Sequence, residues 1–223
     1  MAAMERLSGR IPDMATDDIE YVWYAGYGSN LSWARFRCYL EGGRPPYAQV
    51  GYPGNRGCHG ASSPPLESRM IEIPHQVYFA LPEGSSGTDT WGAGGVAFIR
   101  PEPDGTVATI CRIWLISVEQ YTCVRTQEGR LYSEDVLLSS TAGHPVRTVT
   151  HPVALGNLRP PSWRYLKTIA VGLRETHGLT GRRVNDAEIA AYLADKPGIK
   201  GVLDRSTIET WVAADTCPHG ATW

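Results

Sequence analysis

The run Tyr27–Leu31 reads Tyr-Gly-Ser-Asn-Leu and has the residue types of a small anion-binding turn. An apolar, strand-like segment precedes it and a helix-like segment follows it. A strand that turns directly into a helix leaves several backbone N–H groups pointing at one spot, which is how helix N-termini hold phosphates and carboxylates. Gly28 tolerates a positive φ, and the side chain of Ser29 or Asn30 is of a type that caps helices. The run therefore predicts a cradle of amides.

The same run, at the end of an aromatic-rich first strand, resembles the signature of the γ-glutamyl cyclotransferase-like family. Gly, Ser and Asn occur in turns of many kinds, so an ordinary strand-to-helix turn is the alternative interpretation. The resemblance continues in order from Tyr21 to Gly178 through two further matches. It implies that Tyr27, Gly28, Ser29, Asn30 and Leu31 bind the substrate, with the amides as the active groups.

The second match is Gln127-Glu128-Gly129, at the end of a short helix that follows the central strands. In the family a carboxylate at this place acts as general base and acid, so the resemblance assigns that catalytic role to Glu128. The negative end of the helix dipole and partial burial should both raise the pKa of Glu128. A raised pKa suits proton transfer near neutral pH. An exposed glutamate at a frayed helix end is the alternative.

The third match is a Pro-Ser-x-x-Tyr stretch, residues 161–165, that opens a late helix. In the family its tyrosine lines the substrate pocket, which implies this place for Tyr165. A phenol can donate a hydrogen bond to a carboxylate or to the polar end of a substrate. A core aromatic on an amphipathic helix is the alternative. Tyr132 is a second candidate for the pocket, with a looser match in spacing.

Three arginines, Arg35, Arg37 and Arg125, are of the type that clamps a carboxylate with two hydrogen bonds. Solvated arginines on helix faces are the preferred interpretation. No Gly-x-Ser-x-Gly elbow is present, so Ser29 is not expected to be a nucleophile of that kind.

Composition favours a single compact domain with appendages, because 223 residues with 42% hydrophobic content suffice for one core. A net charge of −2 gives no sign of a nucleic-acid or polybasic membrane surface. Without an apolar signal stretch or membrane span, we expect a cytoplasmic protein. Twenty-four glycines and sixteen prolines suggest a bacterial source of high GC content.

The five cysteines are odd in number and form no Cys-x-x-Cys pair, so we expect no disulfide framework. Cys58-His59 and Cys217-Pro-His219 have poor spacing for zinc, and we expect no structural metal.

Strands are expected at 21–27, 70–73, 76–80, 136–139 and 146–153, and 94–100 with 107–116 are expected to form a hairpin. Helices are expected at 32–40, 117–127, 204–213, from 161 to 178 and from about 185. Strands in the middle of the chain and helices toward its end indicate an α+β fold with a mixed, strongly curved or barrel-like sheet and flanking helices. The Gly- and Pro-rich stretch 45–69 is expected to be a long loop.

We expect an N-terminal extension (1–19), a catalytic domain (20–180) and a C-terminal helical extension (181–223) that packs on the same domain. The resemblance implies an enzyme that needs no cofactor and acts on a small γ-glutamyl substrate, with neither nucleic acid nor membrane as partner. The α-amine would attack the γ-glutamyl amide to give 5-oxoproline and a free amine. The alternatives are removal or transfer of an acyl group on a biosynthetic intermediate, and binding of a γ-glutamyl or amino-acid metabolite without turnover. The sequence leaves the released amine and the oligomeric state open.

Overall fold

The computed structural model describes residues 20–218, and the extension predicted for residues 1–19 lies outside this range. The strands are β1 (Tyr21–Gly26), β2 (Glu67–Ile73), β3 (Val77–Ala80), β4 (Gly87–Thr88), β5 (Gly92–Ala93), β6 (Val96–Ile99), β7 (Thr109–Ser117), β8 (Glu134–Thr141) and β9 (His144–Thr150). The helices are α1 (Trp33–Glu41), α2 (Val118–Glu128), α3 (Trp163–Gly178), α4 (Asp186–Ala194) and α5 (Arg205–Ala213), with 3-10 turns η1 (Ser29–Leu31) and η2 (Gly129–Tyr132).

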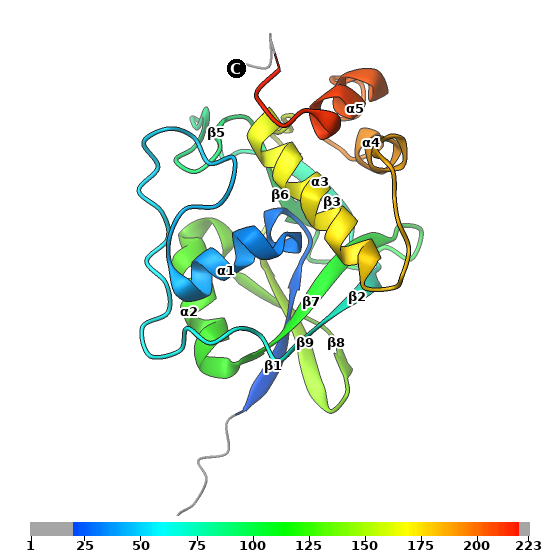
Figure 1. The fold of residues 1–223 in the computed structure, drawn as a ribbon. Coiled ribbons are helices and arrows are strands. Elements are labelled where there is room, and N and C mark those ends of the chain that lie inside the picture. The colour runs from blue at the N-terminus through cyan, green and yellow to red at the C-terminus, as the bar shows by residue number, and fades with distance from the viewer. Residues whose placement is uncertain (1–19, 219–223) are drawn as a thin grey trace, which may run out of the picture.

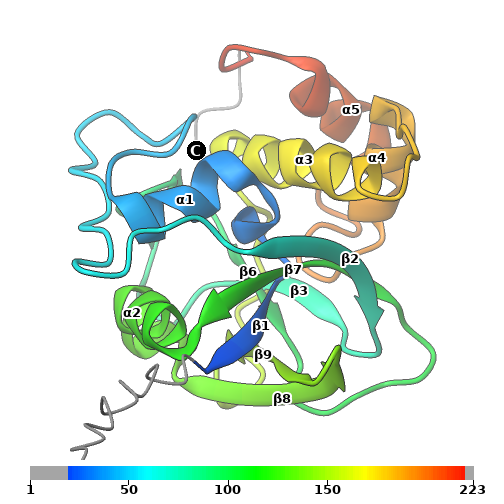
Figure 2. The same cartoon turned by 60° about the horizontal axis from the view of Figure 1, so that its bottom comes forward.

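Five strands form a mixed sheet in the order β2-β7-β1-β9-β8, which confirms the α+β class. β1 pairs antiparallel with β7 and parallel with β9. Figure 1 shows α3 across one face of this sheet, with α1 beside it and α4 and α5 further along. Figure 2 shows α1 and α3 on the same side of the strands, with β8 far from α3. Among residues 20–218 the sheet ends at β2 and β8, so closure into a barrel is not confirmed.

The hairpin expected from 94–100 and 107–116 is wrong. β6 pairs instead with β3, Val77 opposite Ile99, in a separate two-stranded sheet. β7 pairs with β1 on one side and β2 on the other. The turn residues between β6 and β7 therefore connect two sheets. Most of β7 is buried, as expected for a strand with a neighbour on each side.

The small sheet is joined to the large one through a threonine. The Thr150 hydroxyl, at the end of β9, donates to the carbonyl of Ile99 at 2.8 Å and accepts from the Ile99 N–H at 3.2 Å. Both backbone groups of Ile99 are buried, and a buried peptide without partners would be costly. This bridge holds β6 beside β9.

Local capping signals place the helices where the sequence predicts them. Ser117 and Gln120 form a reciprocal capping box at the start of α2, and Asn185 and Glu188 form another at α4. The Ser162 hydroxyl accepts from the N–H of Tyr165 at the start of α3. These caps fix the helix starts without long-range information.

α4 and α5 pack against α3 and contribute to the main core. Ile189, Leu193 and Ile208 are almost fully buried in it. The indole of Trp163 in α3 donates to the carbonyl of Trp211 in α5 at 3.1 Å. The division of the chain at residue 180 stays a prediction. None of the helices described within 20–218 is long and apolar enough to cross a membrane.

Gly172 provides a test of how tightly α3 packs on the turn after β1. A Cβ at Gly172 would lie 2.5 Å from both the Leu31 Cβ and the Ser32 backbone nitrogen. We therefore expect Gly172→Ala to lower the free energy of unfolding by about 1–3 kcal/mol. Chemical denaturation measures this. Gly178→Ala, in the same helix with no atom within 4 Å of its Cβ, is the control and should leave stability nearly unchanged. Equal effects of the two substitutions would contradict the packing described.

Candidate active site

The turn after β1 is built by two short-range backbone bonds. The N–H of Leu31 donates to the carbonyl of Gly28, and that of Ser32 donates to Ser29, each at 3.1 Å. Gly28 has a φ of −114°, so the positive φ considered from the sequence is not used. The N-cap of α1 is Ser32, without a side-chain cap bond, and neither Ser29 nor Asn30 fills that place. The residues of the turn are buried.

Glycine is required at position 28 because other groups approach it closely. A Cβ there would lie 2.7 Å from the Tyr165 hydroxyl oxygen and 3.1 Å from the Ala97 Cβ. The first distance is shorter than side-chain contacts allow, so any other residue would displace Tyr165. The position of Tyr165 in α3 therefore depends on glycine at position 28 of the turn.

Glu128 is the last residue of α2, and Gly129 ends the helix with a φ of 68°. The residue keeps partial exposure, but its carboxylate is surrounded by protein. The Asn30 side-chain nitrogen donates to Glu128 Oε1 at 2.8 Å. Burial raises the pKa of Glu128, while the charge of Arg35 and hydrogen bonds from Tyr39 and Asn30 oppose the rise. The upward direction expected from the sequence is confirmed, with burial as its main cause.

The turn and Glu128 border a cavity of about 30 Å³, which has room for about two waters. Its lining contains every site residue predicted from the sequence except Leu31, and adds three others. The predicted residues are Tyr27, Gly28, Ser29, Asn30, Glu128, Tyr132 and Tyr165, and the additional ones are Tyr24, Ala97 and Val149. Residues 98 positions apart in sequence, Asn30 and Glu128, thus meet at one cavity. Leu31 lies in the main core instead, and its carbonyl accepts from Arg112 at 3.4 Å.

The phenols of Tyr165 and Tyr132 lie on one peptide group at the wall of this cavity. The Tyr165 hydroxyl accepts from the N–H of Ala97 at 3.2 Å, and the Tyr132 hydroxyl donates to the carbonyl of Ala97 at 3.0 Å. Burial raises the pKa of Tyr165, while hydrogen bonds from Ala97 and Ser29 lower it. Tyr27 is fixed in the same way by its bond to the Val149 carbonyl at 2.7 Å. These phenols are neutral, anchored donors and acceptors.

A second cavity of about 170 Å³ shares Ser29, Glu128, Tyr132 and Tyr165 with the first. Its other walls come from α1, from the loop after α1, from the segment around β5 and from α2 and η2: Arg35, Tyr39, Tyr52, Asn55, Thr88, Thr90, Trp91, Val96, Gln127 and Leu131. Glu128 therefore lines two neighbouring cavities, one small and bordered by the turn, the other larger and bordered by the loop.

Arg35 and Tyr39 are site residues that the sequence analysis missed. Arg35 was expected to be solvated but is buried, and its Nη1 donates to Asn55 Oδ1 at 2.6 Å. Its Nη2 donates to the Tyr39 hydroxyl. The signal available was their spacing of four residues, which places both side chains on one face of α1. Arg37, by contrast, is exposed, and Arg125 pairs with Asp135 at 2.9 Å.

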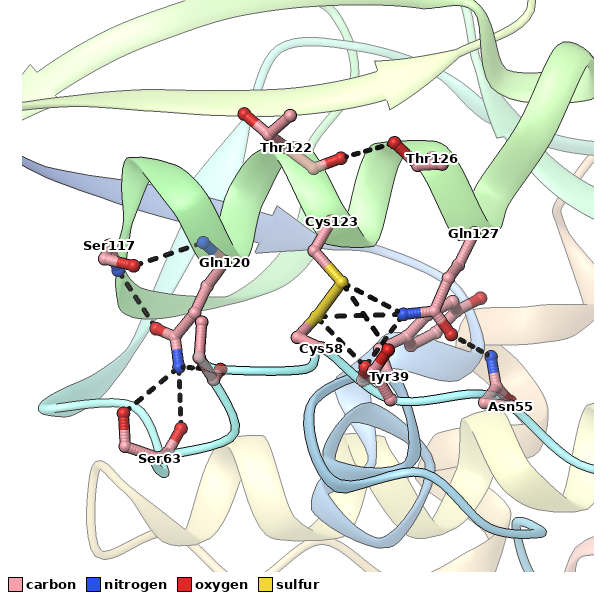
Figure 3. The surroundings of a disulfide bond; sticks show 12 residues. Tyr39, Asn55, Cys58, Ser63, Ser117, Gln120, Thr122, Cys123, Thr126 and Gln127 are labelled. Atoms are coloured by element: carbon pink, nitrogen blue, oxygen red, sulfur yellow. Dashed lines mark hydrogen bonds between the residues drawn. A yellow bond between two sulfur atoms is a disulfide. The ribbon is translucent and has the colours of Figure 1, made fainter.

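Cys58 and Cys123 form a disulfide, which the expectation of no disulfide framework did not foresee. The two are 65 residues apart, and no sequence pattern links them. Figure 3 shows the side chain of Gln127 beside this bond, donating to the Tyr39 carbonyl at 2.8 Å. The Asn55 side-chain nitrogen in turn donates to the side-chain oxygen Oε1 of Gln127 at 3.2 Å. The disulfide thus fastens the loop after α1 to the helix that carries Glu128.

In the part of the chain from 20 to 218, no three His, Cys, Asp or Glu side chains lie close enough together to hold a metal ion. Cys58 is used in the disulfide, and His219 of the second pattern considered for zinc lies outside the described residues.

Comparisons with known proteins give low-identity matches. No family model matches the chain. A curated protein of Arabidopsis thaliana, "Histone deacetylase 5", is 28% identical over 213 residues, which covers 77% of this chain. This chain spans only 30% of the length of that curated relative.

Two solved structures are similar in fold. One, "Gamma-glutamyl cyclotransferase", is 18% identical with a TM-score of 0.49, and the match covers 78% of this chain and 98% of that one. The other, an uncharacterized protein from Homo sapiens, is 18% identical with a TM-score of 0.48. That match covers 79% of this chain and 99% of the human one. At these identities no residue role passes from either structure to this chain.

Removal of the disulfide should destabilise the chain. Cys58→Ala combined with Cys123→Ala frees a loop of about 65 residues in the unfolded state, which in the chain-entropy model lowers the free energy of unfolding by about 4 kcal/mol. Thermal and urea unfolding measure the loss. Cys217→Ala, at an exposed free cysteine, is the control and should have no effect. A double variant as stable as the control would show that the bond does not form in the protein.

Proposed function

We propose that this chain is a γ-glutamyl cyclotransferase-like enzyme that releases 5-oxoproline and a free amine from a γ-glutamyl amide. The observation that carries the proposal is the hydrogen bond from Asn30 to Glu128, because it joins the amide-rich turn to a buried carboxylate at a shared cavity. Neither group alone would distinguish this chemistry from an ordinary turn or an ordinary helix end. Together they supply a site for a charged or polarised oxygen beside a proton acceptor.

The turn would hold an oxygen of the substrate. Ser29 and Tyr165 border the same cavity, and the N–H and hydroxyl of Ser29 lower the pKa of Tyr165, which marks a place where a charged oxygen is stabilised. The α-carboxylate of the substrate, or the γ-carbonyl oxygen as it gains charge, would bind the amides in the same manner. The side-chain Oδ1 of Asn30 is buried and has no hydrogen-bond partner in the described part of the chain, so it is available to accept from a substrate ammonium.

Glu128 would carry the proton in both directions. It takes one proton from the α-ammonium, and the freed amine attacks the γ-carbonyl carbon to form the ring C–N bond. As the bond from that carbon to the leaving nitrogen breaks, Glu128 returns the proton to the leaving amine. The ring nitrogen still carries two protons and gives one of them to the released amine or to water, so that 5-oxoproline ends as a neutral amide. The carboxylate ends unchanged, and no cofactor enters the balance. Because both reacting groups belong to one molecule, correct folding of the substrate supplies up to about 7–11 kcal/mol of the rate enhancement.

The larger cavity would receive the amine that leaves. It begins at Glu128, where the leaving nitrogen needs its proton, and extends along Tyr52 and Asn55 of the loop after α1. This loop would therefore help to determine which amine the enzyme can release.

The test is a panel of γ-glutamyl amides, with 5-oxoproline measured by mass spectrometry. The wild-type protein should form 5-oxoproline from at least one of them. Glu128→Gln keeps the shape of the side chain but not its basicity, so we expect turnover to fall about 10²–10⁴-fold. Glu119→Gln, at an exposed position of the same helix, should retain full activity.

Three results would separate the alternatives. Equal turnover by Glu128→Gln and wild type would remove Glu128 from its role. Binding without product by the wild type would indicate a metabolite-binding protein. Release of a different acyl product from the same panel would indicate acyl removal or transfer.

A further inference from the structure

A buried cation and a phenol line the larger cavity together with the proposed catalytic carboxylate. Arg35 is only 5% exposed and Tyr39 only 3%, and both come from α1. The guanidinium lies 4.1 Å from the centre of the Tyr39 ring, and Nη2 donates to the Tyr39 hydroxyl. Since an arginine has no acceptor, the hydroxyl must accept in this bond. Its own proton is therefore free to be donated elsewhere.

Tyr39, Arg35 and Glu128 line the same cavity. The Arg35 charge and the Tyr39 hydroxyl both lower the pKa of Glu128 and so favour its charged form. The Asn30 side-chain nitrogen donates to the same carboxylate, at 2.8 Å from Oε1. Glu128 thus receives a hydrogen bond from the turn and shares its cavity with a phenol and a cation of α1. A donor and a cation in these places favour an ionised carboxylate.

We propose that Arg35 and Tyr39 are positioning residues that keep the Glu128 side chain ionised inside the protein and so able to accept the first proton. The inference deepens the proposed function and rests on it. A carboxylate taken out of water without compensation becomes neutral. A neutral Glu128 would have no place for the proton of the substrate ammonium, and ring closure could not begin. The Arg35 charge and the Tyr39 hydroxyl supply the compensation.

The other titratable groups that face Glu128 carry no positive charge that could stabilise its ionised carboxylate. The titratable groups that face Glu128 from β1 and its following turn, from η2 and from α3 are the phenols of Tyr24, Tyr27, Tyr132 and Tyr165. Burial raises the pKa of each of them, so all four are neutral at physiological pH. Within residues 20–218, Arg35 is the cation that acts on Glu128.

Arg35 is itself held in place from the loop. Its Nη1 donates to Asn55, which Tyr52 also contacts through its hydroxyl at 3.0 Å. Its Nε is buried and has no partner in the described chain. Two of the three guanidinium nitrogens, Nη1 and Nη2, therefore make hydrogen bonds that fix the position of Arg35. The loop that the disulfide fastens is part of the same arrangement.

The first arm of the test measures Glu128 directly in the free protein. Glutamate labelled with ¹³C at the carboxyl carbon is titrated by NMR, and the Glu128 signal is assigned by its loss in Glu128→Gln. Tyr39→Phe and Arg35→Met should each raise the midpoint by about 1–3 pH units. Arg35→Lys keeps a charge and should restore much of the wild-type midpoint. Tyr121→Phe, which removes another phenol that donates to a carboxylate, Asp135, is the control and should leave the midpoint unchanged.

The second arm measures kcat/KM for 5-oxoproline formation against pH. The acid limb should move to higher pH in Tyr39→Phe, so that activity returns as pH rises. A loss of equal size at every pH, or an unchanged midpoint in the NMR titration, would overturn the positioning role. Absence of product from the wild type with every γ-glutamyl amide would overturn the proposed function instead. In that case the titration alone still decides whether Arg35 and Tyr39 hold Glu128 ionised.

Discussion

The enclosed carboxylate of Glu128 is the constraint on which the rest of the site depends. A charge in such a place is unfavourable unless donors are fixed around it. The donor Asn30 follows β1, and Arg35 and Tyr39, which lower the pKa of Glu128, lie on α1. Three elements must therefore keep their relative positions: the turn, α1 and α2. The pairing of β1 with β7 and the capping box that starts α2 directly after β7 provide this rigidity.

The loop after α1 links this constraint to the outer part of the site. The disulfide joins it to α2 at Cys123, five residues before Glu128. Gln127, next to Glu128, bonds the Tyr39 carbonyl, and Asn55 bonds both Gln127 and Arg35. The wall that would select the leaving amine is therefore continuous with the groups that hold the carboxylate. A change in this loop would be felt in both substrate choice and proton transfer.

Much of the local structure could be predicted because its causes are local. The capping residues at α2 and α4 and the glycine after α2 act within a few positions of the chain. The partners of β6 and β7, the disulfide and the burial of Arg35 could not be predicted in this way. Each depends on contacts between segments tens of residues apart, and periodicity within one segment carries no information about them. The turn and Glu128 were found through family motifs, while Arg35 and Tyr39, which carry no such motif, were not.

The most direct measurement of the central claim separates substrate binding from proton transfer at Glu128. Calorimetry with a γ-glutamyl amide that the wild type consumes would give the affinity of Glu128→Gln, and a single-turnover experiment would give its rate. We predict binding within a few-fold of the wild-type KM and ring closure slower by at least about 10². Ring closure by Glu128→Gln at the wild-type rate would contradict the account.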